Sequence, residues 1–264
     1  MKFALVNNER TEATPGAKGI CPVCGSLVIA KCGEKKVHHW AHKTRKNCKN
    51  NRWETEGEWH QKWKNKFPKD WQEKIVIING EKNIADIQNE QGFVVEFQHS
   101  HINPEEKRAR EQNYKNMVWV VDGTRLKNDL PRFQKNIENN TRLYLTAKPD
   151  FRLFSISWTE EIFPKDWINN TVPVLFDFSG LSDNDTLLYC LLPNNFIFML
   201  SKSQFISEIT TNHWQQFYSD LQDAIKRIAQ QNKQQQEILS NIQANCVFNQ
   251  LTRHLYRGRY HRRF

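Results

Sequence analysis

The stretch KIVIINGEKNIADIQNEQGFVVEFQ, Lys74–Gln98, decides the fold of this chain. It holds three short runs rich in valine, isoleucine and phenylalanine, a composition typical of β-strands. Asn79-Gly80 separates the first two runs and predicts a hairpin, and the polar segment NEQG predicts a turn before the third. We therefore expect consecutive strands over Lys74–Ile78, Lys82–Gln88 and Phe93–Gln98.

Helical patterns flank these strands on both sides. Between Trp53 and Pro68, one set of side chains recurs at helical spacing and forms a single stripe: Glu56, Trp59, His60, Trp63 and Phe67. Pro104–Asn116 begins with Pro-Glu-Glu, a favourable first helical turn, and leads into the apolar strand Met117–Val121. The expected order is helix, three strands, helix and strand, in which the second helix is the crossover of an α/β sheet.

Acidic and amide side chains gather on two of these strands. Glu96 and Gln98 alternate with Phe97, so their side chains leave the same face of the sheet. Asp86 lies on the preceding strand, and the intervening turn brings it within a few residues of Glu96 across the ladder. Carboxylates from separate elements are what Mg²⁺ or Mn²⁺ needs to assist phosphodiester hydrolysis. An acid on a strand is more often solvated, but an acid buried in FVVEFQ requires a partner, which favours a cation.

The first 50 residues lack the apolar periodicity of a self-sufficient core and are rich in cysteine and histidine. Cys21 and Cys24 form a C-x-x-C pair, and His39 with His42 would complete a tetrahedral zinc site. Other ligands stay open: His38 can replace His39, and Cys32 or Cys48 can supply a thiolate. In the competing interpretation the thiols are merely reduced, and HHWAH caps a helix or contacts nucleic acid.

The net charge of +9 on 264 residues is unevenly distributed. Lys43–Arg52 carries five basic residues and no acidic one, close to Trp40 and Trp53. Such a strip suits a phosphate backbone, which makes Lys43, Arg45 and Lys46 candidate DNA contacts, although a solvated basic surface is the alternative. No apolar run approaches the roughly 20 residues of a membrane span, and the polar N-terminus is unlike a signal peptide. We therefore expect a cytoplasmic protein with reduced cysteines.

These motifs together resemble the competence protein CoiA-like nucleases, a family of the PD-(D/E)XK superfamily. The resemblance runs from Cys21 to Gly123 and rests on CPVCG, HHWAH, WETEGEWHQKWK, IADIQ, EFQHS, the R-x-x-x-Y of Arg110 and Tyr114, and WVVDG, in that order. It implies a restriction-endonuclease-like core sheet flanked by helices, behind a zinc-ribbon-like module. It also implies a deoxyribonuclease that depends on Mg²⁺ or Mn²⁺.

The resemblance further implies that Asp86 and Glu96 hold the catalytic cation, with Glu56 and His60 from the first helix beside them. Glu58 is the rival for the helix acid. We prefer Glu56, because Glu58 lies about 160° from it on the helical wheel and off the apolar stripe.

Gln98 then occupies the position of the usual lysine of this superfamily. A neutral amide can orient the attacking water, but it cannot stabilise developing negative charge as a lysine does. Arg110 and Tyr114, one helical turn apart, would contact the scissile phosphate or hold their helix against the site.

Beyond Leu126 the pattern predicts three more strands, in TVPVLFDFSG, TLLYCLL and FIFMLS, and helix from about Ser203 to Phe248. Near-heptad apolar spacing in the helical region favours an arm or a homodimer contact, and a pair of helices covering the sheet is the alternative. The arginine-rich end, RHLYRGRYHRRF, predicts a disordered tail that binds phosphates.

We thus expect four segments: a zinc module (1–50), a nuclease core (51–148), a β-rich extension (149–202) and a helical region with a basic tail (203–264). Metal-dependent hydrolysis of DNA is the function that they favour. The main alternative is a single-stranded DNA-binding accessory protein for recombination or DNA uptake, with little or no cleavage. An RNA-directed nuclease ranks third, because no RNA-reading motif is present. A recombination or defence protein would be the protein partner.

Overall fold

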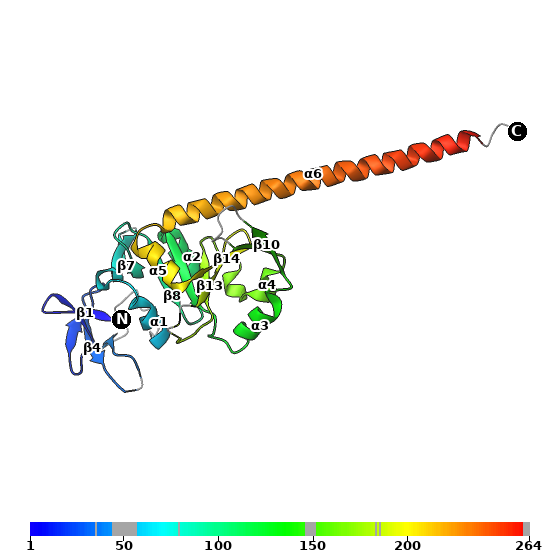
Figure 1. The fold of residues 1–264 in the computed structure, drawn as a ribbon. Helices are drawn as coiled ribbons and strands as arrows, with labels where there is room; N and C mark the ends of the chain where they lie inside the picture. The colour runs from blue at the N-terminus through cyan, green and yellow to red at the C-terminus, as the bar shows by residue number, and fades with distance from the viewer. Residues whose placement is uncertain are drawn as a thin grey trace. The chain divides into compact units, whose positions relative to one another are not determined.

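The computed structural model describes residues 1–34, 36–43, 57–78, 80–145, 152–182, 184 and 186–260. It contains two compact units, Met1–His213 and Trp214–Phe264. The first unit holds two β-sheets with their helices, and the described part of the second is one long helix, α6 (Trp214–Tyr260) (Figure 1). None of the helices in the described part of the chain combines the length and the hydropathy that a bilayer crossing demands.

A five-stranded antiparallel sheet begins the chain. Its strands are β1 (Phe3–Val6), β2 (Glu9–Glu12), β3 (Lys18–Ile20), β4 (Leu27–Lys31) and β5 (His39–His42), in the spatial order β2-β1-β3-β4-β5. Its core is small and centres on Ala4, Cys21, Val28 and Trp40. Because so few apolar side chains are buried, a sheet of this size needs a further constraint to be stable.

The second sheet is mixed, and its first half has the element order expected from the sequence. That order is α1 (Glu58–Lys64), β6 (Gln72–Ile78), β7 (Glu81–Gln88), β8 (Val94–Gln98), α2 (Pro104–Asn113) and β9 (Met117–Asp122). β6, β7 and β8 are antiparallel neighbours, whereas β8 and β9 are parallel, so α2 is the predicted crossover helix. The mixed α/β class predicted from the sequence is confirmed.

Local sequence accounts for these elements. Gly80, at φ +81°, supplies a left-handed residue in the turn between β6 and β7. Asn103 caps α2, because its side chain accepts a hydrogen bond of 2.8 Å from the backbone N–H of Glu105, and Pro104 fits the first helical turn. Every residue of β8 and β9 is buried, as in central strands that are covered on both faces.

The following segments of the described chain add five strands to the same sheet, together with two helices. They are α3 (Asp129–Asn136), β10 (Thr141–Leu145), β11 (Arg152–Ile156), α4 (Thr159–Ile162), β12 (Val174–Asp177), β13 (Leu187–Leu191) and β14 (Phe196–Ser201). The order across the sheet is β10-β11-β14-β13-β12-β9-β8-β7-β6. The three strands expected here are β12, β13 and β14, whereas β10 and β11 were not expected. β12 lies parallel to β9 and sets Asp177 beside Asp122.

Three helix boundaries differ from the sequence prediction. Helical spacing continued to Pro68, but α1 ends at Lys64, because a proline disfavours helical backbone in the residue before it. A second break separates α5 (Lys202–Thr210) from α6, at Asn212 with φ +59°. The arginine-rich end, predicted to be disordered, is helical as far as Tyr260, since glutamine, arginine and leucine favour helix.

α6 carries exposed apolar side chains at Ile238, Leu239 and Ile242. Exposed apolar side chains on one segment are a feature of protein contact surfaces. The homodimer contact through this region therefore stays a prediction.

Gly123, just after β9, is a position without room for a side chain. A Cβ there would lie 2.4 Å from Cδ1 of Phe178, whose ring stacks on Phe133. We expect Gly123→Ala to lower the free energy of unfolding by about 1–3 kcal/mol, the usual cost of overpacking. Urea unfolding would measure the change. Gly33→Ala is the control, because nothing lies within 4 Å of its Cβ, and equal losses in both variants would contradict the prediction.

Candidate active site

The candidate active site lies where β7 and β8 separate. Backbone pairing between them is limited to Ile87 with Val95 and Gln88 with Val94, and the next residues along the two strands are Asp86 and Glu96. The Oδ2 atom of Asp86 instead accepts a hydrogen bond of 3.0 Å from the backbone N–H of Phe97. The predicted proximity of Asp86 and Glu96 across the ladder is therefore confirmed.

Helix α1 brings two basic side chains to Asp86. His60 Nε2 lies 2.9 Å from Asp86 Oδ2, and Lys64 Nζ, one helical turn later, lies 3.7 Å from Asp86 Oδ1. The helix is held there by aromatic packing, because the ring of Trp63 stacks on Phe97 of β8. Burial alone would raise the pKa of Asp86, but His60 and Lys64 outweigh it and hold this pKa well below its usual range.

Helix α2 brings a third basic side chain, Arg110, to Glu96. Its Nη1 donates to Glu96 Oε2 at 2.6 Å, and its Nη2 donates to Glu106 Oε1 at 2.7 Å. Glu96 is only 1% exposed, and its other oxygen, Oε1, makes no hydrogen bond within the described part of the chain. Burial raises the pKa of Glu96 to about 7, although Arg110 lowers it. A buried carboxylate oxygen without a donor is a position that a cation can satisfy.

The raised pKa of Glu96 has a consequence for stability without Mg²⁺ or Mn²⁺. The folded state binds the carboxyl proton of Glu96 more tightly than the unfolded state does. The stabilisation that this proton gives to the folded state is therefore complete below pH 4.5 and is lost as the pH rises through 7. Relative to Glu96→Gln, the wild-type free energy of unfolding should therefore fall by about 3 kcal/mol between pH 4.5 and 8. Urea titrations at both pH values measure it. The exposed Glu58→Gln is the control, and parallel curves for wild type and Glu96→Gln would refute the prediction.

The other residues predicted for this site differ in where they lie. Gln98 is buried on the same side of β8 as Glu96, and its Nε2 donates to the carbonyl oxygen of Ser100 at 3.0 Å. Tyr114 is buried at the end of α2, where burial and Glu96 raise its pKa. Glu58 has a largely exposed carboxylate 3.7 Å from Lys62, so it does not point toward Asp86.

Part of the prediction concerns residues that the structure does not describe. Glu56, Arg45, Lys46 and Cys48 lie outside the described residues. Their predicted roles as helix acid, phosphate contacts and zinc ligand therefore stay predictions. Lys43, the remaining basic candidate, is exposed just after β5 in the N-terminal sheet.

Two charged residues near Asp86 were not identified from the sequence. Lys64 is fully buried, and its Nζ also lies 2.9 Å from Oε1 of Glu73 at the start of β6. The signal for Lys64 was present, because it follows His60 by four residues and shares its helix face. No sequence pattern indicated Glu73, which meets Lys64 only through the tertiary fold.

A second polar pair lies at the ends of the neighbouring strands. His99 Nδ1 is 2.7 Å from Asp122 Oδ2, and the other oxygen of Asp122 accepts hydrogen bonds from the backbone N–H and the hydroxyl of Thr124. The imidazole of His99 is half exposed, whereas Asp122 is buried. This pair also was not expected from the sequence, although His99 stands in the motif EFQHS.

The N-terminal sheet contains a separate candidate metal centre. One ligand atom each from Cys21, Cys24 and His42 lie within 4.8 Å of one another, and Cys24 Sγ is 3.3 Å from His42 Nε2. Burial would raise the pKa of Cys24, but hydrogen bonds from Ser26 and His42 outweigh it and lower this pKa to about 6. A thiol that ionises readily and a histidine are ligands suited to zinc, so this group could bind such a metal.

His39, the fourth predicted zinc ligand, does not belong to this group. His39–His42 forms strand β5, in which residues three apart point to opposite faces, so His39 and His42 cannot converge. His39 Nδ1 lies instead 2.9 Å from the carbonyl oxygen of Val37. Neither of the described alternatives, His38 and Cys32, joins the group. Among the described residues, the candidate zinc group therefore consists of Cys21, Cys24 and His42 without His39.

Comparison with protein families gives two matches, in order along the chain. The family model of the competence protein CoiA, N-terminal domain, matches residues 6–51, and that of the CoiA nuclease-like domain matches residues 57–164. Together they cover more than half of the chain, including both candidate sites. Comparison with curated proteins and with solved structures gives no match. The chain belongs to the competence protein CoiA family.

Proposed function

We propose that this protein is a metal-dependent DNA nuclease of the PD-(D/E)XK kind, in which Asp86 and Glu96 hold Mg²⁺ or Mn²⁺. The observation that carries the proposal is the buried Oε1 atom of Glu96, which lacks a hydrogen bond among the described residues and lies next to a second carboxylate. Carboxylate oxygens are the ligands that hard cations prefer. The order α1, β6, β7, β8, α2, β9 and the match to a nuclease-like domain support it.

A bound cation would polarise the phosphoryl oxygen and lower the pKa of the attacking water. The residues of this chain supply the rest. His60 holds Asp86 from α1, at 2.9 Å, and Arg110 holds Glu96 from α2, at 2.6 Å. Gln98 is proposed to orient the attacking water, and Glu56 to help to place the cation or the water.

Recognition of DNA is proposed to rest on positive charge. The chain has a net charge of +9, and each phosphate that a lysine or arginine neutralises releases condensed counterions. Lys43, Arg45 and Lys46 would contact the phosphate backbone, and Arg110 with Tyr114 would contact the scissile phosphate or hold α2 against the site. The arginines near the end of α6 would add further phosphate contacts.

Zinc is proposed as the structural metal of the N-terminal sheet. Cys21, Cys24 and His42 would bind it, and Cys48 is the candidate for the fourth position. Three ligands within 4.8 Å of one another would link β5 to the turn that follows β3. Such a link would replace the apolar core that the sheet lacks.

A single-stranded DNA-binding protein without cleavage is the competing function. Its specific support is Gln98, because a neutral amide at this position removes the charge that normally assists phosphoryl transfer. Family membership fits both functions, since competence requires handling of incoming DNA as well as processing of it. A recombination or defence partner is part of this second proposal.

The deciding experiment is cleavage of plasmid and single-stranded DNA by the full chain, with Mg²⁺, Mn²⁺ or Ca²⁺. The proposal expects cleavage with Mg²⁺ or Mn²⁺, and loss of cleavage in Asp86→Ala. Cleavage that survives in Asp86→Ala would point to a contaminating nuclease. Binding of DNA without cleavage under any of these cations would favour the accessory function instead.

A further inference from the structure

Lys64 is a charged side chain in a position that is costly to occupy. It is fully buried in α1, and burial of an ammonium group costs several kcal/mol unless other charges surround it closely. Its Nζ lies 2.9 Å from Glu73 Oε1 and 3.7 Å from Asp86 Oδ1. Lys64 therefore links a carboxylate of β6 to one of the proposed cation ligands.

Glu73 in turn links Lys64 to the beginning of the chain. Its Oε1 accepts a hydrogen bond of 2.6 Å from the backbone N–H of Lys2, and its Oε2 accepts one of 3.0 Å from that of Phe3. Glu73 adopts φ +45°, a left-handed conformation that is uncommon for residues other than glycine. Such a conformation persists only where the surroundings hold it.

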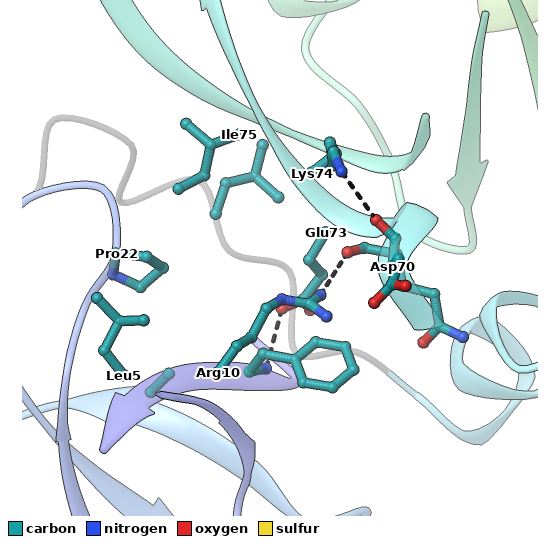
Figure 2. Close-up of a pocket in the computed structure, with 11 residues that line it drawn as sticks. Leu5, Arg10, Pro22, Asp70, Glu73, Lys74 and Ile75 are labelled. Atoms are coloured by element: carbon teal, nitrogen blue, oxygen red, sulfur yellow. Dashed lines mark hydrogen bonds between the residues drawn. The ribbon is translucent and has the colours of Figure 1, made fainter. Parts of the chain in front are cut away.

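The surroundings of Glu73 form a junction between the two sheets. Figure 2 shows Glu73 facing β1 next to Arg10. Arg10 donates to the carbonyl oxygens of Lys69 and Gln72, and its guanidinium lies 3.5 Å from the centre of the Phe3 ring. The first two strands are thus held by several independent contacts to the segment that carries Glu73.

We propose that Lys64 and Glu73 are positioning residues of the active site, and that the N-terminal sheet completes this pair through the backbone of β1. The inference rests on the proposed nuclease function and deepens it. Lys64 fixes one oxygen of Asp86, while His60 and the backbone of Phe97 fix the other. The N-terminal sheet then contributes to the active site, because its backbone holds the carboxylate of Glu73 beside the ammonium group of Lys64.

This arrangement also restores a positive charge that the strand lacks. Gln98 on β8 is neutral, whereas Lys64 on α1 brings an ammonium group to Asp86. Because Lys64 is fully buried, it acts through Asp86 and not by contacting DNA directly. Its removal should slow the cleavage step without weakening DNA binding.

The test compares Lys64→Met with Lys62→Met, its matched control. Lys62 is on the same helix and partly exposed, and its Nζ contacts the carbonyl oxygen of Leu181 and the carboxylate of Glu58, both outside the site. Cleavage is measured in single turnover at saturating Mn²⁺, and DNA affinity is measured in Ca²⁺. We expect Lys64→Met to lose about 10- to 100-fold in rate with unchanged DNA affinity, as for other residues that orient metal ligands. Lys64→Arg should recover part of the rate.

Glu73→Gln tests the second half of the pair. It should reproduce the loss of rate, and the double variant with Lys64→Met should be no slower than the slower single variant. Glu12→Gln is the control at the junction, because Glu12 contacts Lys69 and Lys2 but not Lys64. Rates in Lys64→Met or Glu73→Gln equal to those of their controls would overturn the proposal.

A second measurement tests the positioning of Asp86 by Lys64 even if the protein is not a nuclease. If the wild type cleaves no DNA with any cation, thermal unfolding of Lys64→Met, Asp86→Asn and the double variant replaces the kinetic test. Coupled changes in the unfolding temperature would support the positioning of Asp86 by Lys64, and additive changes would overturn it. The same measurement identifies a variant that loses rate only because it has unfolded at the assay temperature.

Discussion

Replacement of Glu96 by alanine is expected to lower the rate of DNA cleavage by about a thousandfold or more. The cation would lose one of its two proposed carboxylate ligands, and a cation at a phosphoryl group is worth several kcal/mol of transition-state stabilisation. Single-turnover cleavage of a labelled duplex at saturating Mn²⁺ measures the loss. DNA affinity in Ca²⁺ should fall much less, because phosphate contacts by basic residues supply most of it.

Glu58→Ala is the matched control for this prediction. Glu58 is also an acid near the site in sequence, but its carboxylate is exposed and near Lys62. Its replacement should leave the rate at the wild-type level. A Glu96→Ala protein that cleaves as fast as Glu58→Ala would remove Glu96 from the reaction and with it the proposed cation site.

The core of the fold was predictable because local signals agreed with one another. Runs rich in valine, isoleucine and phenylalanine, Gly80 in the hairpin, and Asn103 with Pro104 at the start of α2 each specify an element without reference to distant residues. Once the strands are known, the pairing of Ile87 with Val95 makes Asp86 and Glu96 the next residues along the two strands. The family resemblance had indicated the same two residues.

Two expectations from the sequence differ from the structure: the pairing of His39 with His42 as zinc ligands, and the length of the first helix. His39 and His42 were considered as a ligand pair, but in β5 they lie on opposite faces, so only His42 joins the two cysteines. The helix expected to reach Pro68 stops at Lys64, where the chain must turn toward β6.

Contacts between distant segments account for what could not be predicted. Glu73 meets Lys2, Phe3 and Lys64 only because β1 and α1 both pack against the start of β6. The spacing of Lys64 from His60 indicates a shared helix face, but it does not show that the ammonium group is buried, since the nearby Lys62 and Lys66 are partly or largely exposed. The charge balance around Asp86 is therefore a property of the tertiary structure.

The N-terminal sheet should depend on its metal for folding. We expect Cys21→Ser to abolish zinc binding and to unfold this sheet, because structural zinc contributes on the order of 10 kcal/mol to small domains with few buried side chains. Metal analysis and far-ultraviolet circular dichroism would measure both changes. His42→Ala should behave in the same way, whereas His39→Ala should retain zinc, since only His42 lies with the cysteines.

Cys32→Ser is the matched control, because Cys32 is a partly buried cysteine of the same sheet outside the metal group. Unchanged zinc content in Cys21→Ser would remove the metal centre. Loss of zinc with an intact sheet would mean that Ala4, Val28 and Trp40 suffice as a core. If the sheet unfolds as expected, Glu73 loses its bonds to the first strand, and DNA cleavage should fall together with the zinc content. Cleavage that stays at the wild-type rate in a zinc-free, unfolded N-terminal sheet would show that the two sites work independently.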